Sequence, residues 1–265
     1  MNDAGRHDVW ASGSAYESYV GRWSRLVAEE FLSWLGVPPQ DRWLDVGCGT
    51  GALSQAVLDK ASPVEVCGID PSAGYIDYAR EQVTDSRARF EVGDAQALPF
   101  EDATFDAVVS GLVLNFVPAP AKAVWEMARV ARAGGTVAVY VWDYGGEMQL
   151  MRYFWDAAAA LDPGSELDEG RRFPICRPGP LTAVFQGAGL TDVEARAIDI
   201  STRFRDFDEY WAPFLGGQGP APGYVASLSE AERVALKDRL RDIIPAAPDG
   251  SIDLIARAWA VRGRV

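Results

Sequence analysis

The chain has 265 residues, of which 48% are hydrophobic and 24% are charged, and its formal net charge is −13. This length allows one large α/β domain or two small ones, and either can bury a hydrophobic core. Proteins that bind a polyanion rely on clustered Lys and Arg, so the acidic balance argues against a nucleic-acid partner. A small or weakly charged substrate fits the composition better.

The cysteines, Cys48, Cys67 and Cys176, are odd in number and lack the spacing of metal ligands. We therefore expect neither a metal site nor a disulfide framework. The N-terminal residues show no apolar run behind a basic start, and the most apolar stretch, 107–117, is too short to span a bilayer. These features predict a cytoplasmic protein without membrane association, either a monomer or a homodimer.

Residues 22–35 carry apolar side chains at three- and four-residue spacing and are followed by Gly36, which predicts an amphipathic helix. Strands and helices then alternate along the chain. This alternation is typical of a doubly wound, mostly parallel sheet that binds ligands at the carboxyl ends of its strands. The predicted strands are 42–45, 64–70, 88–92, 105–110 and 136–142, and the predicted helices are 52–58, one starting near 71, and 121–133, which Gly134 and Gly135 would end.

After Trp142 the alternation changes. The predicted order is a helix at 148–161, a loop-like stretch at 162–180, a short helix at 181–187, a strand at 192–204, a helical stretch at 206–245 and a strand at 252–261. We predict one domain over 1–265 with a seven-stranded sheet. Its core comprises about 22–142, 181–204 and 252–262, and helical lid insertions comprise about 1–21, 145–178 and 206–247.

A glycine-rich segment directly follows the first predicted strand, which ends at Asp45. The glycines at 47, 49 and 51 allow a sharp turn and a close approach of a ligand to the backbone. Gly47, Gly49 and Ala52 also fit the fingerprint of NAD-binding loops. Asp45 favours a different ligand, because a carboxylate would repel a pyrophosphate but suits a ligand that carries an ammonium and a sulfonium.

Two further acidic residues follow predicted strands. Asp70 ends the second strand, where a carboxylate can accept hydrogen bonds from both hydroxyls of an adenosine ribose. This feature is common to NAD and S-adenosylmethionine (SAM) binders. Asp94 follows the third strand and could accept from the adenine amino group while the Ala95 amide donates to the ring; a simple turn explains Gly93-Asp94 equally well.

The spacing of these elements over about residues 40–142 resembles that of the class I SAM-dependent methyltransferases. It looks closest to the subgroup that includes the ubiquinone and menaquinone biosynthesis methyltransferases. The resemblance implies SAM as cofactor, S-adenosylhomocysteine (SAH) as product, and a segment at 105–116 that runs past the methionine moiety towards the acceptor. The cofactor-binding residues taken from it and from the spacing are Asp45, Gly47, Cys48, Gly49, Gly51, Asp70, Pro71, Asp94, Ala95, Ser110, Leu112 and Asn115.

Similar methyltransferases often carry a tyrosine-rich segment before the first helix, and here Tyr16, Tyr19 and Arg22 occupy that place. Arg22 could bind the cofactor carboxylate through two parallel hydrogen bonds, and a tyrosine could cap the sulfonium through cation–π attraction. The alternative is a solvated arginine at a helix start beside aromatic residues that only pack.

Catalysis of methyl transfer needs alignment of donor and acceptor in a dry pocket, and a base only where the acceptor loses a proton. The single histidine, His7, is expected at the surface, and no catalytic residue can be assigned. The candidate bases are Asp143, Tyr144 and Glu147, without a preference among them.

Aromatic residues gather in or beside the two insertions. One interpretation is an apolar acceptor pocket walled mainly by the aromatic residues of the predicted lid, and the alternative is that most of these residues only pack in the core. The residues concerned are Trp142, Tyr144, Tyr153, Phe154, Trp155, Tyr210 and Trp211, with Tyr153, Trp155, Tyr210 and Trp211 as the expected wall.

The function predicted from the sequence is methyl transfer from SAM to O, N or C of a small, apolar or aromatic molecule. A NAD(P)-dependent oxidoreductase would explain the glycines and Asp70 but leaves Asp45 and Asp94 without a role. A non-catalytic SAM-binding module is a third possibility. The identity of the bound ligand separates the first two, and methyl transfer to an acceptor separates the first from the third.

Overall fold

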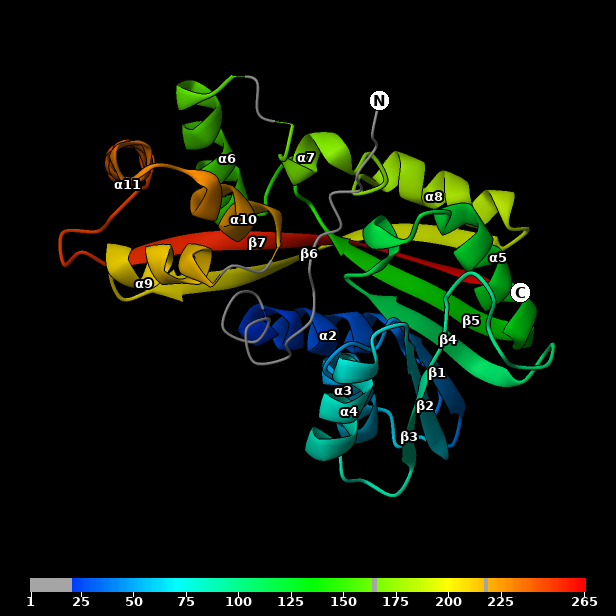
Figure 1. The fold of residues 1–265 in the computed structure, drawn as a ribbon. Helices are drawn as coiled ribbons and strands as arrows, with labels where there is room; N and C mark the ends of the chain where they lie inside the picture. The colour runs from blue at the N-terminus through cyan, green and yellow to red at the C-terminus, as the bar shows by residue number, and fades with distance from the viewer. Residues whose placement is uncertain (1–20, 164–165, 217–218) are drawn as a thin grey trace.

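The computed structural model describes residues 21–163, 166–216 and 219–265. At its centre lies a seven-stranded sheet with the order β3-β2-β1-β4-β5-β7-β6 (Figure 1). Strands β1 to β5 pair in parallel, and β7 lies antiparallel between β5 and β6. The predicted doubly wound, mostly parallel sheet is therefore confirmed. The strands are β1 (Arg42–Val46), β2 (Glu65–Asp70), β3 (Ala88–Val92), β4 (Phe105–Gly111), β5 (Ala131–Trp142), β6 (Thr191–Phe204) and β7 (Ile252–Arg264).

Helices cover both faces of this sheet, which is why β4 is buried along almost its whole length. Helices α2 (Arg22–Leu35), α3 (Ala52–Lys60) and α4 (Ala73–Gln82) lie on one face, and α5 (Pro120–Val130) and α8 (Pro178–Gly187) lie on the other (Figure 1). Within the described ranges, no helix combines the length and the apolar character that a membrane span requires.

The first described helix, α2, forms where the sequence predicts it. It buries Val27, Phe31 and Leu35, and it ends at Gly36, whose φ of 57° lies in the left-handed region. The Phe31 ring packs 4.7 Å from the ring of Tyr140 in β5. This contact fixes α2 over the carboxyl end of the central strands.

One predicted boundary is wrong. Helix α5 ends at Val130, and β5 begins at Ala131, so Gly134 and Gly135 lie within the strand and do not end the helix. Two pairings account for the difference. Ala131 pairs with Phe105 ahead of an irregularity in the β4–β5 ladder, and Gly134 and Gly135 exchange backbone hydrogen bonds with Val265.

The antiparallel ribbon of β6 and β7 extends beyond the parallel part of the sheet. The β5–β7 ladder ends at the pair Trp142–Ala258, whereas the β6–β7 ladder continues to Phe204–Ile252. A layer of helices gathers at this extension (Figure 1). These helices are α6 (Gln149–Leu161), α7 (Glu169–Arg172), α9 (Phe207–Trp211), the 3-10 helix η3 (Ala212–Leu215), α10 (Pro220–Ser227) and α11 (Glu230–Ile243). The stretch predicted as a loop thus contains α7 and the start of α8.

Aromatic rings hold this helical layer together. The rings of Phe154 and Phe214 stack with centroids 4.5 Å apart, and the Tyr210 hydroxyl donates to the backbone oxygen of Leu150 at 2.9 Å. Trp155 and Tyr210 are almost completely buried. The layer therefore has a hydrophobic core of its own. The hydrogen bond to Leu150 gives the buried Tyr210 hydroxyl the partner that a buried polar group needs.

We expect Tyr210→Phe to lower the free energy of unfolding by about 1 kcal/mol, because it removes a buried hydrogen bond without changing the shape of the ring. Urea unfolding measures the change. Tyr153→Phe, on a half-buried ring of the same helical layer, is the control and should change stability by less than about 0.5 kcal/mol. Equal losses in the two variants would contradict this account of the cluster.

Candidate active site

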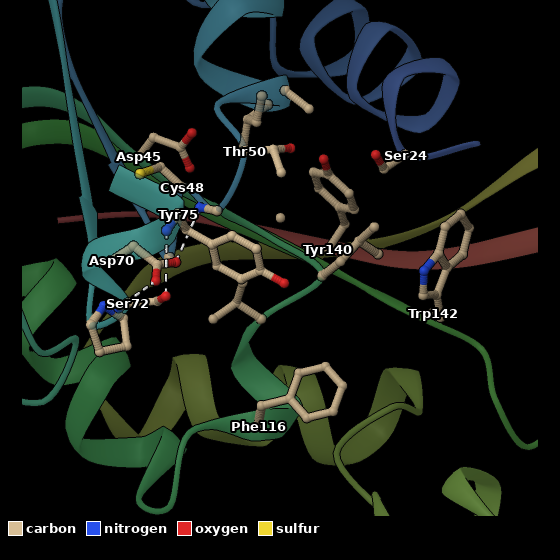
Figure 2. Close-up of a pocket in the computed structure, with 18 of the residues that line it drawn as sticks. Ser24, Asp45, Cys48, Thr50, Asp70, Ser72, Tyr75, Phe116, Tyr140 and Trp142 are labelled. Atoms are coloured by element: carbon tan, nitrogen blue, oxygen red, sulfur yellow. Dashed lines mark hydrogen bonds between the residues drawn. The ribbon is translucent and has the colours of Figure 1, made fainter. Parts of the chain in front are cut away.

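A cavity opens at the carboxyl ends of β1, β2, β4 and β5, where the strand order reverses between β1 and β4. Ligands of doubly wound sheets bind at such a reversal. Figure 2 shows the acidic and loop residues at one end of the cavity and Trp142 at the other. The described lining residues are Ser24, Asp45, Gly47, Cys48, Gly49, Thr50, Ala52, Leu53, Asp70, Pro71, Ser72, Tyr75, Gly111, Leu112, Val113, Phe116, Tyr140, Trp142, Tyr144, Met151 and Glu169.

The glycine-rich loop between β1 and α3 forms one wall of the cavity. Gly47 has a φ of +74°, and a Cβ atom built on it would lie 2.5 Å from the Val113 side chain. Its N–H and that of Cys48 both donate to the backbone oxygen of Ile69, at 2.7 and 3.0 Å. Only glycine meets these constraints at position 47 without strain, and its use lets the loop pack tightly against β2.

Asp45 lies at the end of β1 and is buried. Its Oδ2 accepts a hydrogen bond from the Ser54 hydroxyl at 2.7 Å, whereas its Oδ1 is buried and has no hydrogen-bond partner among the described residues. Burial raises the pKa of Asp45 to about 7. The hydrogen bond from Ser54 lowers this pKa, and the nearby Asp70 carboxylate raises it further. A ligand group that is positively charged or donates N–H would satisfy the unpaired oxygen.

Asp70, at the end of β2, faces the same cavity. Its Oδ2 accepts from the Gly49 amide at 3.1 Å and its Oδ1 from the Ser72 amide at 2.9 Å (Figure 2). Burial raises the pKa of Asp70, and the two backbone donors oppose that rise. The two amides fix the carboxylate, and each oxygen keeps acceptor capacity for a further donor. Such a group suits the two neighbouring hydroxyls of a ribose.

The cavity wall includes seven of the predicted cofactor-binding residues: Asp45, Gly47, Cys48, Gly49, Asp70, Pro71 and Leu112. Leu112 has a φ of 62°, and its N–H is tied to the backbone oxygen of Tyr140 at 2.7 Å. A non-glycine residue in the left-handed region is uncommon, and such strain often occurs at functional sites.

The other predicted residues lie elsewhere. Asp94 is exposed and accepts from the Gln96 amide at 2.8 Å in a turn, with Ala95 between them. Ser110 is buried in β4, and Asn115 is buried in the 3-10 helix η2 (Leu114–Phe116). For these residues and for Gly51, a contact with the cofactor stays a prediction.

The expected contact of Arg22 with the cofactor stays a prediction, and its surroundings show other partners. Its guanidinium forms an ion pair with Glu209 at 2.9 Å and lies 4.2 Å from the centre of the Trp23 ring, and the residue does not line the cavity. Tyr16 and Tyr19 lie outside the described residues, as does nearly all of the predicted lid segment 1–21.

The expected aromatic wall is corrected. Of the seven aromatic residues singled out near the insertions, only Trp142 and Tyr144 line the cavity, and Phe116, Tyr140 and Tyr75 complete its aromatic surface (Figure 2). The reason is geometric. Tyr140 and Trp142 are two residues apart in β5, so their side chains lie on the same face of the sheet. The expected wall residues Tyr153, Trp155, Tyr210 and Trp211 do not line the cavity, and the last three belong to the core of the helical layer.

Of the three candidate bases, Tyr144 lines the cavity and the other two do not. Asp143 accepts from the Glu147 amide at 3.0 Å, so the two residues close a turn after β5. Sequence reasoning missed Glu169, which lies in a stretch predicted as a loop. The residues that the structure describes contain no cluster of three or more His, Cys, Asp or Glu that could hold a metal ion.

Comparison with known proteins identifies a methyltransferase domain over residues 44–139. A demethylmenaquinone methyltransferase of Roseiflexus castenholzii is 32% identical over 180 residues, which cover 63% of this chain and 75% of that protein. A 2-methyl-6-phytyl-1,4-hydroquinone methyltransferase of Synechocystis is 32% identical over 261 residues, covering 88% and 81%. A demethylmenaquinone methyltransferase of Renibacterium salmoninarum is 39% identical over 118 residues, and there the chain spans only 46% of the relative's length.

Solved structures show the same fold. A putative methyltransferase of Bacillus halodurans superimposes with a TM-score of 0.60 at 15% identity, covering 89% of this chain and 97% of that one. The YcgJ protein of Bacillus subtilis gives 0.58 at 19% identity, covering 90% and 97%. At such identities the likeness concerns the fold alone.

We expect Asp70→Ala to weaken SAH binding roughly 100-fold or more, because it removes two hydrogen bonds to a charged acceptor, each worth about 1.5–3 kcal/mol. Titration calorimetry measures the affinity, and circular dichroism checks that the loop change leaves the fold intact. Asp238→Ala, which removes an exposed carboxylate from α11, should bind SAH like the unchanged protein. An unaltered affinity in Asp70→Ala would rule out the ribose contact.

Proposed function

The chain belongs to the class I SAM-dependent methyltransferases, and we propose that its acceptor is a small molecule with an aromatic or apolar body, methylated at O, N or C. The observation that carries this proposal is one cavity with two different ends. Asp45 and Asp70 lie at the first end, and Phe116, Tyr140 and Trp142 form the second (Figure 2). A polar nucleoside and an apolar acceptor can therefore share one enclosed space.

The acidic end fits SAM. The unpaired Oδ1 of Asp45 is a buried acceptor that an ammonium or a sulfonium would satisfy, and Asp70 offers two oxygens to ribose hydroxyls. When bound, SAM supplies a methyl group already activated by its positive sulfur. The residues of the chain then orient the two reactants and exclude water.

The aromatic end suits a flat ring. Tyr140 and Trp142 are buried in β5, and the half-buried Phe116 ring is held edge-on against Phe173 at 5.2 Å. Aromatic surfaces of this kind favour stacked or edge-on contacts with another ring. The names of the relatives support the same class, because demethylmenaquinone and a phytyl hydroquinone are ring compounds with apolar substituents.

The proposal also covers the partners of the protein and its place in the cell. The net charge of −13 supports a small molecule over nucleic acid as the second substrate. Three free cysteines, all buried, suit the reducing cytoplasm, where we place the protein as a monomer or a homodimer. A panel of phenols, hydroquinones and amines, incubated with the protein and SAM and assayed for SAH release and methylated product, tests the proposal.

We expect Phe116→Ala to raise the KM for the acceptor at least several-fold and to leave SAH affinity within about twofold, because a truncated aromatic wall loses roughly 1–2 kcal/mol of contact. Steady-state kinetics and calorimetry give the two values. The control is Phe100→Ala, which truncates another half-buried ring, one that packs on Phe105 outside the cavity. Equal loss of SAH and acceptor binding in Phe116→Ala would show that the two ends of the cavity are not separate sites.

A further inference from the structure

Glu169 is a buried carboxyl group in the wall of the cavity, outside the acidic end formed by Asp45 and Asp70. It begins the short helix α7 and is only 2% exposed. Among the described lining residues it is the one remaining acid, and neither Lys, Arg nor His lines the cavity with it. Burial of a carboxyl group is costly, so its place in a substrate cavity calls for a functional explanation.

Glu169 lies at the aromatic end. The residue that follows it, Gly170, is packed so closely that an added Cβ atom would lie 2.8 Å from the backbone oxygen of Tyr144. Phe173, directly after α7, contacts the rings of both Phe116 and Tyr144. In Figure 1, α7 lies across the sheet from α3 and α4, which flank the acidic end. The carboxyl group is thus on the acceptor's side of the cavity.

The surroundings of Glu169 hold it in place. The indole N–H of Trp155 donates to its Oε2. Asp168 caps α7 by accepting from the Gly170 amide at 2.8 Å, and Arg152 donates to both Asp168 oxygens at 3.1 and 2.9 Å. Arg152 therefore pairs with Asp168, whereas the hydrogen-bond donors to the Glu169 carboxyl group are neutral: the Trp155 indole and the residue's own backbone N–H.

This environment favours a proton on the Glu169 carboxyl group. Burial raises the pKa of Glu169 to about 8. The residue's own backbone N–H, the Trp155 indole and the Arg172 guanidinium lower it, and the Asp168 carboxylate raises it. The other titratable groups near it are the Cys176 thiol, whose pKa burial also raises, and Asp143 beside that thiol. Once ionised, a carboxyl group with a pKa near 8 gives a carboxylate that is a stronger base than an ordinary carboxylate.

We propose that Glu169 is the general base of the reaction and that the acceptor carries an ionisable hydroxyl group, as a phenol or hydroquinone does. This inference rests on the proposed function. The acceptor O–H bond breaks and its proton passes to a Glu169 oxygen. The electron pair left on the phenolate forms the new bond to the methyl group, and the pair of the broken S–C bond stays on sulfur. If a ring carbon is methylated, a later proton shift from that carbon to the oxygen restores the ring.

The principal test is Glu169→Gln, which has the shape of the protonated side chain and should fold. The probes are substituted phenols and hydroquinones of graded acidity, assayed between pH 6 and 9.5. For weakly acidic phenols and saturating SAM, we expect kcat/KM of the unchanged protein to rise with pH and to level off at or below about pH 8, and Glu169→Gln to lose roughly 100-fold or more with a flattened profile. With a nitrophenol that is already ionised, Glu169→Gln should lose much less of its kcat/KM. The SAH affinity of the variant should be unchanged.

A second readout does not depend on activity. Because the folded-state pKa of Glu169 lies above its unfolded value, its contribution to stability is present at low pH and declines as the pH rises towards about 8. In Glu169→Gln, the thermal unfolding temperature should therefore fall less with rising pH than in the unchanged protein, because the titrating carboxyl group is absent. Trp155→Phe, which removes the N–H donor, should move the kinetic inflection to higher pH. Glu166→Gln removes an exposed carboxylate three residues earlier in the chain and should alter none of these values.

The outcomes separate the two proposals. Full activity and an unchanged pH profile in Glu169→Gln would overturn the role of Glu169 and leave methyl transfer intact. Methylation of amines alone would overturn the hydroxyl acceptor, while failure of the unchanged protein to bind SAH would overturn the proposed function itself.

Discussion

The arrangement of charge in the cavity depends on one constraint: Asp45 is buried at the point where the strand order reverses, with one oxygen unpaired. Asp70 lies close enough to raise its pKa, and no Lys, Arg or His lines the described wall. Among the described residues, the wall thus supplies negative charge without a facing cation. A ligand can complete the balance, and one with both an ammonium and a sulfonium meets that need better than one with a pyrophosphate.

The aromatic half of the cavity depends on the long antiparallel ribbon. Because the β6–β7 ladder continues past the end of β5, β7 offers a platform on which α6 can pack. The buried rings of Phe154 and Tyr210 stabilise that layer. Helix α7, bonded to α6 through Arg152 and the Trp155 indole, is in turn held against the cavity. The aromatic end is therefore assembled from segments distant in sequence that hydrogen bonds and buried rings hold together.

Local patterns allowed the sheet and the cofactor end to be predicted. Alternating strands and helices, Asp45 before the glycines and Asp70 at a strand end are features of neighbouring residues. The acceptor end depends on contacts that no local pattern contains. The ion pair of Arg22 joins residues far apart in the chain. Whether a ring such as Trp155 faces a cavity or a neighbouring helix depends on the partner helix, which amphipathic spacing does not reveal. Glu169 lies in a helix of four residues, too short to leave a periodic signal.

Asp45 and Glu169 are both buried in the cavity wall but differ in how the cost of burial can be offset. Asp45, paired only with a hydroxyl, leaves one oxygen for a cation of the ligand, whereas the raised pKa of Glu169 favours its own proton. In the proposed reaction, a sulfonium in the shared cavity lowers the pKa of Glu169, since an opposite charge in a dry space favours the carboxylate. The base is then ionised when a methyl group is at hand. Transfer removes the positive charge, so the pKa of Glu169 rises again and the carboxyl group keeps the proton taken from the acceptor. The loss of positive charge on the cofactor thus makes the proton transfer to Glu169 harder to reverse.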